Sequence, residues 1–495
     1  MREASAIRAE AVRRLAERFG ASAVLDAPTQ IAPYRGDLMY RQEEAELCVF
    51  RPSSAEMLSE GLALLADLPI LLVPRGGGSG LAGGATPGAG AASLVVSTER
   101  MRTLRRIDRD ACLMVAEAGV VLAEAQAAAR EAGLHLGLTH GGAGSATLGG
   151  SVATNAGGAN VLRHGMARDQ ILGIEAVLAD GTLIAGAAEL WKDNTGYSLP
   201  QLLAGSEGTL AFVTAVTLKL RAPPLDRQAA LFGLAGPAQA LALLRLARDL
   251  LGDAVTAAEL MSRSATDFAA GMGVAKVPLE SAPGWLLLLE AERTSRFFDL
   301  AAGFDALLEA AFEEGLAGDG VFAQSEAQRL GLWSLREGVA EAMDLWRGPI
   351  LRTDCAVPLG QVPRFVAGVD AHVAALGGGL RAAFFGHIGD GNIHVNVMPP
   401  APGDALPGKA ALSEAIESIA LSLGGTVSAE HGIGLHKRAA LRRMKPAAEL
   451  ALMGRIKSAF DPANRLNPGN IFGSCGDDAK GAPEPHKDAF RCSRP

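Results

Sequence analysis

Short apolar runs alternate with glycine-rich stretches between residues 24 and 220. Runs of three to five mostly apolar residues, bounded by glycine or polar residues, are typical of buried strands. Such runs predict strands at residues 71–73, 94–96, 113–116 and 174–178. Asp180-Gly181 follows the last run and predicts a hairpin turn into a strand at residues 182–184. Residues 122–132 are rich in Ala, Leu, Arg and Glu, which predicts a helix.

The pattern changes after residues 221–224 (Arg-Ala-Pro-Pro), whose prolines predict a domain boundary. Residues 237–251 predict a helix with its proline in the first turn, and residues 297–314 predict an amphipathic helix. The apolar run at residues 285–290 predicts either a buried strand or a short helix. The final residues, 473–495, are rich in Gly, Pro, Asp and Lys, which predicts a disordered tail.

The composition indicates a globular protein without a nucleic-acid partner. Hydrophobic residues make up 49% and charged residues 20% of the 495 residues, a length typical of about three domains. The net charge is −8 and no block of basic residues is present. Because neutralisation of phosphates dominates nucleic-acid affinity, this balance excludes DNA or RNA as a partner.

The sequence predicts a cytoplasmic protein. Residues 1–18 alternate Arg, Glu and Ala like an amphipathic surface helix and lack the apolar core of a signal peptide. Two long uncharged stretches, residues 76–98 and 137–161, contain too many glycines for transmembrane helices. The five cysteines are scattered without CxxC spacing, which favours free thiols in a reducing compartment. Peripheral association with a membrane stays open.

Residues 78–83 match the dinucleotide-binding pattern GxGxxG and follow a predicted strand. That motif binds a pyrophosphate only when a helix begins within the loop and directs its N-terminus at the phosphates. Residues 84–90 read Gly-Ala-Thr-Pro-Gly-Ala-Gly, which cannot hold a helix. A Rossmann nicotinamide site is therefore excluded.

A second glycine-rich loop covers residues 141–150 and is followed by Thr-Asn-Ala-Gly-Gly at residues 154–158. Two separate loops of this kind can turn backbone N–H groups toward one diphosphate without a helix dipole. The alternative is that the glycines only serve tight turns and strand crossings, which is the stronger interpretation for one loop alone. Both loops together favour a diphosphate-containing cofactor.

Side chains with metal-binding chemistry concentrate at His387, His394 and the adjacent pair Glu430-His431. Two imidazoles and a carboxylate are usual ligands of a borderline cation such as zinc, and a three-ligand site leaves one position open for substrate. His431 stands beside the carboxylate and could move a proton. The alternative for any single histidine is a hydrogen-bonded core residue. The grouping predicts a reactive metal centre.

The spacing of the two histidines requires a turn between them. His394 lies seven positions after His387, so on one straight strand the two side chains would face opposite sides. Residues 389–392 (Gly-Asp-Gly-Asn) are typical of a turn, which can bring both imidazoles to one point. His394 and Asn396 then share one strand face, and the neighbouring valines take the other.

Three motifs together resemble the FAD-linked oxidases of the vanillyl-alcohol-oxidase type. They are residues 75–80, the second glycine-rich loop and residues 203–210 (Leu-Ala-Gly-Ser-Glu-Gly-Thr-Leu). Further motifs narrow the resemblance to the branch of D-2-hydroxyglutarate dehydrogenase, D-lactate dehydrogenase and the glycolate oxidase flavin subunit. These are residues 386–394, residues 428–434 and residues 461–469. The resemblance runs from about residue 31 to residue 472.

The resemblance implies an α+β fold, in which a two-lobed FAD-binding domain of the vanillyl-alcohol-oxidase (PCMH) type is joined to an α+β substrate (cap) domain. The expected parts are an FAD-binding domain at 1–222 (PCMH-type region about 42–222), a substrate domain with the metal site at 223–440, a segment at 441–472 that returns to the flavin domain, and the tail at 473–495. Some relatives tether the flavin through a histidine in the first loop. Residues 76–79 contain none, so FAD is expected to bind non-covalently.

The resemblance also assigns residue roles. The implied FAD contacts are Arg75, Gly76, Gly77, Gly78, Ser79, Gly80, Gly144, Ser145, Leu148, Gly149, Gly150, Thr154, Asn155, Gly158, Glu207, Val213 and Asn467. The implied ligands of a divalent metal, with zinc as the first choice, are His387, His394 and Glu430. His431 would be the general base, Asn396 would contact the substrate, and Arg336 would clamp a carboxylate.

The implied reaction is the oxidation of a D-2-hydroxy acid to a 2-oxo acid with hydride transfer to the flavin. The electrons would pass on to an electron-transfer flavoprotein, a quinone or a cytochrome, and a homodimer stays open. Two positions depart from the hydroxyglutarate branch, which usually has Thr at the position of Ala340 and Lys at the position of Arg352. Both positions help that branch to hold the distal carboxylate. Arg352 could still bind this part of the substrate with altered reach, whereas Ala340 cannot. The substrate could therefore be D-2-hydroxyglutarate, D-lactate or a similar acid.

Two other functions stay open on the sequence alone. One is a glycolate oxidase-type flavin subunit that works within a larger complex. The other is a metal hydrolase without a flavin, in which Glu430 or His431 would activate water.

Overall fold

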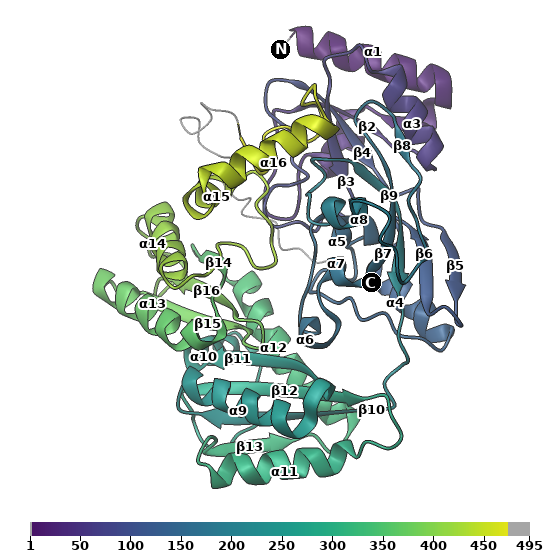
Figure 1. The fold of residues 1–495 in the computed structure, drawn as a ribbon. Helices are drawn as coiled ribbons and strands as arrows, with labels where there is room; N and C mark the ends of the chain where they lie inside the picture. Colours follow the sequence, from purple (N-terminus) through teal and green to yellow (C-terminus); the bar gives the residue numbers. More distant parts are fainter. Residues whose placement is uncertain (1, 474–495) are drawn as a thin grey trace. The chain divides into compact units, whose positions relative to one another are not determined.

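The structure is a computed structural model that describes residues 2–473, and these residues form two compact units (Figure 1). Unit 1 comprises residues 2–157, 165–223 and 430–473 of the described chain, and unit 2 comprises residues 158–164 and 224–429. The chain thus passes into unit 2 at residue 224, within the stretch where the sequence predicts a domain boundary. Apart from Gly473, the tail predicted at residues 473–495 lies outside the described residues.

A four-stranded sheet with the order β1-β2-β4-β3 forms one half of unit 1. The pairs β2–β4 and β3–β4 are parallel, and β1 is antiparallel to β2. Helix α1 buries Ala4, Ala11 and Leu15 in the core beside this sheet. The elements are α1 (Arg2–Phe19), β1 (Val24–Leu25), α2 (Pro28–Ile31), β2 (Glu46–Phe50), α3 (Ala55–Leu64), β3 (Leu71–Arg75) and β4 (Ala92–Ser97).

The other half of unit 1 is a five-stranded antiparallel sheet with the order β5-β6-β9-β7-β8. Strands β7 and β8 pair across Asp180-Gly181, which confirms the predicted hairpin. The strands are β5 (Leu104–Asp108), β6 (Leu113–Glu117), β7 (Ile171–Val177), β8 (Leu183–Ile184) and β9 (Phe212–Lys219). The helices are α4 (Leu122–Glu131), α5 (Leu148–Ala153), α7 (Ala167–Gln170) and α8 (Leu199–Leu203).

The last described segment of the chain completes unit 1. It contains α15 (Arg438–Met444) and α16 (Ala447–Phe460) and then runs along the open edge of β3. There the N–H of Leu72 donates to the carbonyl of Arg465 at 2.8 Å, and the N–H of Asn467 donates to the carbonyl of Leu72 at 2.6 Å. The edge strand β3 is covered in this way, and Asn467 is fixed beside the loop that follows β3.

Unit 2 is built on a seven-stranded sheet with the order β13-β10-β12-β11-β15-β16-β14, in which every pair is antiparallel. Its strands are β10 (Asp226–Leu234), β11 (Val255–Ser262), β12 (Trp285–Arg293), β13 (Asp319–Phe322), β14 (Leu351–Ala356), β15 (Arg381–His387) and β16 (Asn392–Met398). The run at residues 285–290 is therefore a strand. Helices cover both faces of β12, which explains why its sequence is continuously apolar.

Alternate residues of each strand enter two separate cores. In β10, Ala230 and Phe232 join the core under α9 (Pro237–Leu251), α11 (Leu300–Glu313), α13 (Val362–Leu376) and α14 (Lys409–Ser422). Ala229 and Leu231 join the core under α10 (Arg263–Gly271) and α12 (Glu326–Leu345). Figure 1 shows α9 and α11 along the β10–β13 part of the sheet. The short helix α6 (Val161–His164) also belongs to unit 2.

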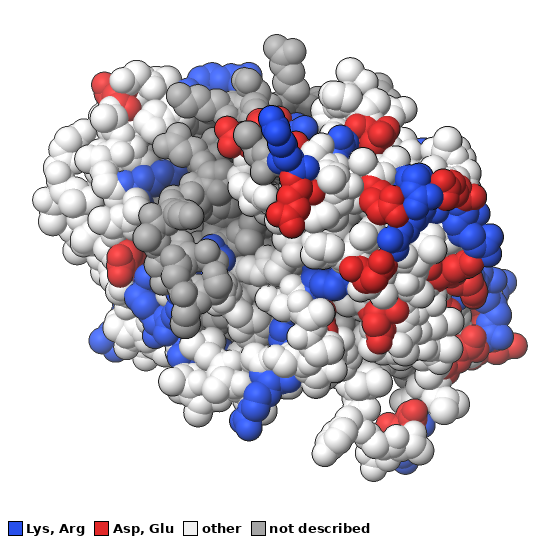
Figure 2. Space-filling model, turned by 90° about the horizontal axis from the view of Figure 1, so that it is seen from above, with Lys and Arg blue, Asp and Glu red and all other residues white. Residues whose placement is uncertain are grey.

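Charged side chains of both signs are interspersed on the face that Figure 2 shows. Helix α1 is an example, since Arg13 pairs with Glu10 at 2.7 Å and Arg14 pairs with Asp67 at 2.6 Å. Neutralised pairs of this kind do not make a surface for phosphate backbones. No helix within residues 2–473 combines the length and the apolar character needed to cross a bilayer.

Candidate functional site

The two glycine-rich loops of unit 1 lie directly against each other. A Cβ atom on Gly77 would stand 1.9 Å from the carbonyl oxygen of Ser145, and one on Gly76 would stand 2.4 Å from Thr147 Oγ1. Only glycine permits so close an approach of two backbones. No helix begins between residues 76 and 91, which confirms that the GxGxxG match is not a Rossmann site. Both loops therefore present their backbone in one place, as a shared diphosphate site requires.

The second loop differs from the expectation in one respect, because a short helix does begin in it. Helix α5 starts at Leu148, and Thr147 caps it by accepting a hydrogen bond from the N–H of Gly150 at 3.3 Å. Glycines have low helix propensity, so Gly149 and Gly150 concealed the helix in the sequence. Gly149 is required by packing, since a Cβ there would stand 2.5 Å from Ala118 Cβ.

Other expected FAD contacts surround these loops. Arg75 ends β3 and places its guanidinium over the ring of Tyr34 at 5.3 Å. Asn155 follows α5 with φ +51°, and its Oδ1 accepts a hydrogen bond from the N–H of Arg168 at 2.9 Å. Val213 is buried in β9. The expected contacts Ser79, Gly80, Gly144 and Thr154 lie in these two loops and their flanks, and Gly158 belongs to unit 2.

Glu207 and Asn467 are engaged within unit 1. The carboxylate of Glu207 accepts hydrogen bonds from the N–H groups of Ile433 at 2.7 Å and Gly434 at 2.6 Å. Burial raises the pKa of Glu207, and these two hydrogen bonds oppose the rise. Asn467 Nδ2 donates to the carbonyls of Gly84 at 2.9 Å and Glu207 at 3.0 Å. The two side chains thus join the first glycine loop to the loop that carries Glu430 and His431, and their contact with FAD stays a prediction.

Sequence reasoning missed His140, which precedes the second glycine loop. Its Nδ1 accepts a hydrogen bond from the N–H of Gly142 at 3.2 Å, and its Nε2 lies 3.0 Å from Ser151 Oγ. Burial lowers the pKa of His140, and the negative charge of Glu430 opposes this. The signal was present in the sequence, since His140 is one of only nine histidines and adjoins a glycine motif.

In unit 2 the predicted turn between the two histidines is confirmed. Strands β15 and β16 form a hairpin, in which the N–H of Gly391 donates to the carbonyl of Ile388 at 3.2 Å. Gly391 has φ +84°, and a Cβ there would stand 2.1 Å from the carbonyl oxygen of Val357. The ring centroids of His387 and His394 come to 6.2 Å from each other. Each side chain keeps 12% of its surface exposed.

Each histidine faces a buried carboxylate. His387 Nδ1 lies 2.5 Å from Glu259 Oε1, and His394 Nδ1 lies 3.8 Å from Asp354 Oδ1. Glu259 is fully buried and Asp354 is 1% exposed. Burial alone would raise the pKa of Glu259, but the charges and hydrogen bonds of His387 and Arg336 lower it to about 2. Because an ionised carboxylate only accepts hydrogen bonds, His387 donates from Nδ1 to Glu259.

Arg336 is buried and does not lie on the surface. It extends from α12, is 8% exposed, and donates from Nε to Glu259 Oε2 at 2.7 Å. Its guanidinium lies over the ring of Phe385 at 4.9 Å. Asn396 is 3% exposed and belongs to the strand β16 that carries His394. Val395 and Val397 point into the opposite core, as the alternation predicted.

Arg352 is placed beside Asn396 by the pairing of β14 with β16. Its Nη1 donates to Asp344 Oδ1 at 2.6 Å, and its Nη2 donates to the carbonyl of Met343 at 2.6 Å. The structure therefore gives this guanidinium protein partners at the end of α12, and contact with a substrate stays a prediction.

Asp354 anchors the backbone of Ala429, the residue before Glu430 and His431. Asp354 Oδ2 accepts a hydrogen bond from the N–H of Ala429 at 3.1 Å, while its Oδ1 faces His394. Consecutive Cα atoms are about 3.8 Å apart, so Glu430 starts one residue from the point that Asp354 fixes. After His431, the N–H groups of Ile433 and Gly434 donate hydrogen bonds to the carboxylate of Glu207.

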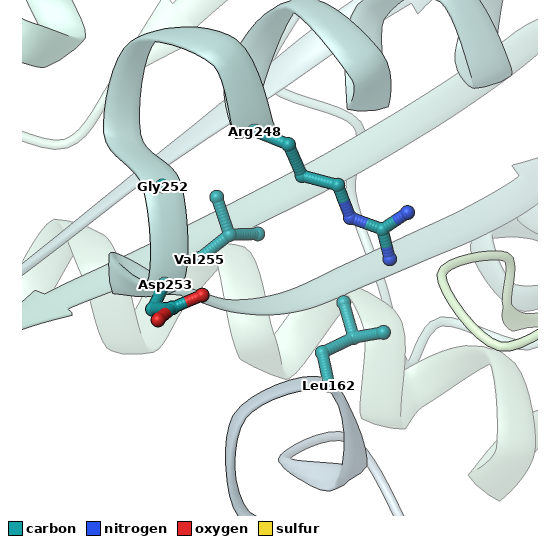
Figure 3. Close-up of a pocket in the computed structure, with 5 residues that line it drawn as sticks. All are labelled: Leu162, Arg248, Gly252, Asp253 and Val255. Atoms are coloured by element: carbon teal, nitrogen blue, oxygen red, sulfur yellow. The ribbon is translucent and has the colours of Figure 1, made fainter.

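A pocket of about 180 Å³ lies elsewhere in unit 2 and is lined by Leu162, Arg248, Gly252, Asp253 and Val255 (Figure 3). None of the predicted site residues lines it. Arg248 donates a hydrogen bond to the carbonyl of Gly389 at 3.2 Å, which supports the turn between the two histidines.

Paired glycine loops on a two-sheet unit, joined to a helix-covered antiparallel sheet, define an FAD-dependent oxidoreductase of the two-domain type. The chain belongs to the FAD-linked oxidase family. Residues 223–471 match the C-terminal domain of FAD linked oxidases, and residues 47–186 match an FAD binding domain. This membership argues against the metal hydrolase without a flavin.

The chain is similar to two proteins named D-2-hydroxyglutarate dehydrogenase. That of Stutzerimonas stutzeri is 33% identical over 452 residues, which cover 91% of this chain and 96% of the relative. The mitochondrial protein of Bos taurus is 32% identical over 452 residues, which cover 91% of this chain and 81% of the relative. The similarity therefore extends through both units.

Solved structures support the fold. A p-cresol methylhydroxylase structure with substrate bound superposes with a TM-score of 0.72 at 15% identity, covering 94% of this chain and 97% of that chain. A 4-ethylphenol oxidase from Gulosibacter chungangensis gives a TM-score of 0.71 at 16% identity, covering 95% and 98%. The α+β class and the PCMH-type flavin domain predicted from the sequence are confirmed.

Proposed function

We propose that the protein oxidises a D-2-hydroxy acid to the 2-oxo acid in a reaction that depends on FAD and a divalent metal. The observation that carries the proposal is the hairpin in which His387 and His394 each turn Nδ1 toward a buried carboxylate. Carboxylate–histidine pairs of this kind are typical of metal ligands, because they fix the tautomer and leave Nε2 for the metal. Two such imidazoles and the carboxylate of Glu430 suit zinc and related cations.

Each side chain of the proposed site would then have a separate role in the reaction. When bound, the cation would lower the pKa of the substrate hydroxyl, and FAD would accept the hydride. His431, in its neutral form, would remove the hydroxyl proton, which typically contributes about 10²–10⁴-fold in rate. Arg336 would hold the substrate carboxylate, and Asn396 would contact the substrate from the strand of His394.

The two candidate substrates, D-2-hydroxyglutarate and D-lactate, differ in whether they carry a distal carboxylate. The names of the relatives support D-2-hydroxyglutarate as the first candidate. Ala340 offers no hydrogen-bonding group for a distal carboxylate, and Arg352 is already paired with Asp344. D-Lactate, which has no distal carboxylate, is the second candidate. We further propose an electron-transfer flavoprotein, a quinone or a cytochrome as the acceptor, and a cytoplasmic location.

Anaerobic flavin reduction tests the proposal. The purified flavoprotein is mixed in a stopped-flow instrument with the D and L forms of 2-hydroxyglutarate and lactate, and the flavin absorbance is followed. At least one D acid is expected to bleach the flavin within seconds, whereas its L form leaves it oxidised. A flavin that no D-2-hydroxy acid bleaches contradicts the proposal and favours a flavoprotein subunit of a larger complex.

A further inference from the structure

We propose that Glu259 is a positioning residue that holds a metal ligand and the substrate clamp with one carboxylate, and so couples metal binding to substrate binding. The inference rests on the proposed function for its two partners, His387 and Arg336. Glu259 itself lies in β11, where it faces His387 across the antiparallel pair β11–β15. It touches no reacting atom, so it would act entirely through its neighbours.

The geometry assigns one carboxylate oxygen to each partner. Oε1 lies 2.5 Å from His387 Nδ1, and Oε2 accepts from Arg336 Nε at 2.7 Å. The carboxylate is fully buried, so water does not compete for either oxygen. Movement of one partner therefore changes the position of the carboxylate that orients the other.

The bond to Nε also determines how Arg336 can grip a ligand. A guanidinium can bind a carboxylate either through Nε and one terminal nitrogen or through both terminal nitrogens. Glu259 occupies Nε, and no hydrogen bond from the described residues engages the two terminal nitrogens. Phe385 covers the guanidinium at 4.9 Å. The geometry therefore points to an end-on grip in which both terminal nitrogens bind the substrate carboxylate.

Only an ionised carboxylate can serve both partners. A glutamine at this position offers one oxygen acceptor and one NH₂ donor. Either Arg336 Nε then faces a donor and loses its anchor, or His387 must accept at Nδ1. In the second case the ring proton moves to Nε2, the atom that would bind the metal. Glu259→Gln should therefore impair the clamp, the metal ligand or both.

The same sheet and helix provide a matched control. Glu290 lies in the neighbouring strand β12, is 6% exposed, and accepts hydrogen bonds from Arg329 and from Trp333 Nε1, the latter at 2.6 Å. Arg329 lies on α12, like Arg336. Within residues 2–473, no hydrogen bond or ion pair joins this second glutamate–arginine pair to a histidine. Glu290→Gln thus removes a buried charge beside α12 without touching the proposed site.

The test measures two properties of the flavoprotein after its metal has been removed. Zn²⁺ affinity is determined by competition with a chromophoric chelator, and the tautomer of His387 is read from ¹⁵N shifts of labelled histidines, assigned with His387→Asn. For Glu259→Gln we expect a 10–100-fold weaker Zn²⁺ affinity and the loss of the Nδ1-protonated signature. Glu290→Gln should resemble the wild type in both. Flavin content and melting temperature report whether each variant folds.

A second variant, Glu259→Asp, tests the inference if Glu259→Gln does not fold. Glu259→Asp keeps the charge but is one methylene shorter and cannot keep both bonds, so a raised KM or a weaker Zn²⁺ affinity is expected. Wild-type Zn²⁺ affinity, KM and His387 tautomer in both variants would overturn the inference. A wild-type protein that binds no Zn²⁺ would instead contradict the proposed function, while the tautomer of His387 still decides the role of Glu259.

Discussion

Asp354 accepts a hydrogen bond from the backbone N–H of Ala429 at 3.1 Å, and its other carboxylate oxygen faces His394 Nδ1 at 3.8 Å. One buried carboxylate thus lies beside an imidazole of the hairpin and binds the residue that precedes Glu430. Asn392 Nδ2 donates to the same carboxylate at 3.1 Å and limits its rotation. His394 and Ala429 are therefore distant in sequence but share Asp354 as a partner.

Asp354→Asn should lower the metal affinity of the protein by about 10–100-fold, because the negative charge beside His394 Nδ1 is lost. The measurement is the metal content after dialysis against a weak chelator, determined by elemental analysis. Asp370→Asn, on the exposed surface of α13, is the control and should retain the wild-type content. Equal metal content in all three proteins would show that Asp354 does not contribute to metal binding.

His431→Asn should keep FAD and metal but reduce the flavin about 10²–10⁴-fold more slowly with the best D-2-hydroxy acid, because no general base takes the hydroxyl proton. Stopped-flow absorbance under anaerobic conditions measures the rate. The flavin spectrum and the metal content are the controls for an intact site. A rate near that of the wild type would assign the base to another residue.

Gly77→Ala should lower the ratio of flavin to protein, because the new Cβ would stand 1.9 Å from the carbonyl oxygen of Ser145 and force the two glycine loops apart. Gly84→Ala is the matched control, since no atom lies within 4 Å of a Cβ there. The ratio of flavin to protein absorbance in purified samples measures the effect. If the two variants retain equal amounts of flavin, the packing of the loops does not form the cofactor site.

Glu292→Gln should make the free energy of unfolding less dependent on pH below 4.5. Burial would raise the pKa of Glu292, but His164, Arg227 and Arg163 lower it from 4.5 to about 2. The stabilisation is thus fully present above pH 4.5 and is lost as the pH falls toward 2. At pH 7 the variant should be less stable by roughly 3–4 kcal/mol, judged from 1.4 kcal/mol per pKa unit. Urea midpoints at several pH values should show the gap closing below pH 4.5.

Elements whose sequence pattern matches the way they are buried in the fold could be predicted from the sequence. Residues 237–251 form α9 with the predicted bounds, because a proline in the first turn and an apolar stripe both define a helix there. The run at residues 285–290 could not be assigned from periodicity, since a strand buried on both faces has no alternation. Helix α5 was missed because its glycines serve packing against Ala118 and conceal its helical character.

The candidate metal ligands could be predicted from the sequence, but the residues that position them could not. His387, His394 and Glu430 carry recognisable chemistry, and the turn between the histidines follows from its glycines. Glu259 could not be found, because it lies 128 residues before His387 in an apolar strand and only the pairing of β11 with β15 brings the two together. Partners across a sheet depend on register, which a single sequence does not reveal.

Single-turnover flavin reduction before and after removal of the metal tests whether a bound cation activates the substrate hydroxyl. The chelator-treated flavoprotein, mixed anaerobically with the best D-2-hydroxy acid, should leave its flavin oxidised. Addition of stoichiometric Zn²⁺, Mn²⁺ or Co²⁺ should restore bleaching, and His387→Asn should not recover. If the metal-free protein reduces its flavin at the original rate, metal-assisted activation of the hydroxyl is contradicted.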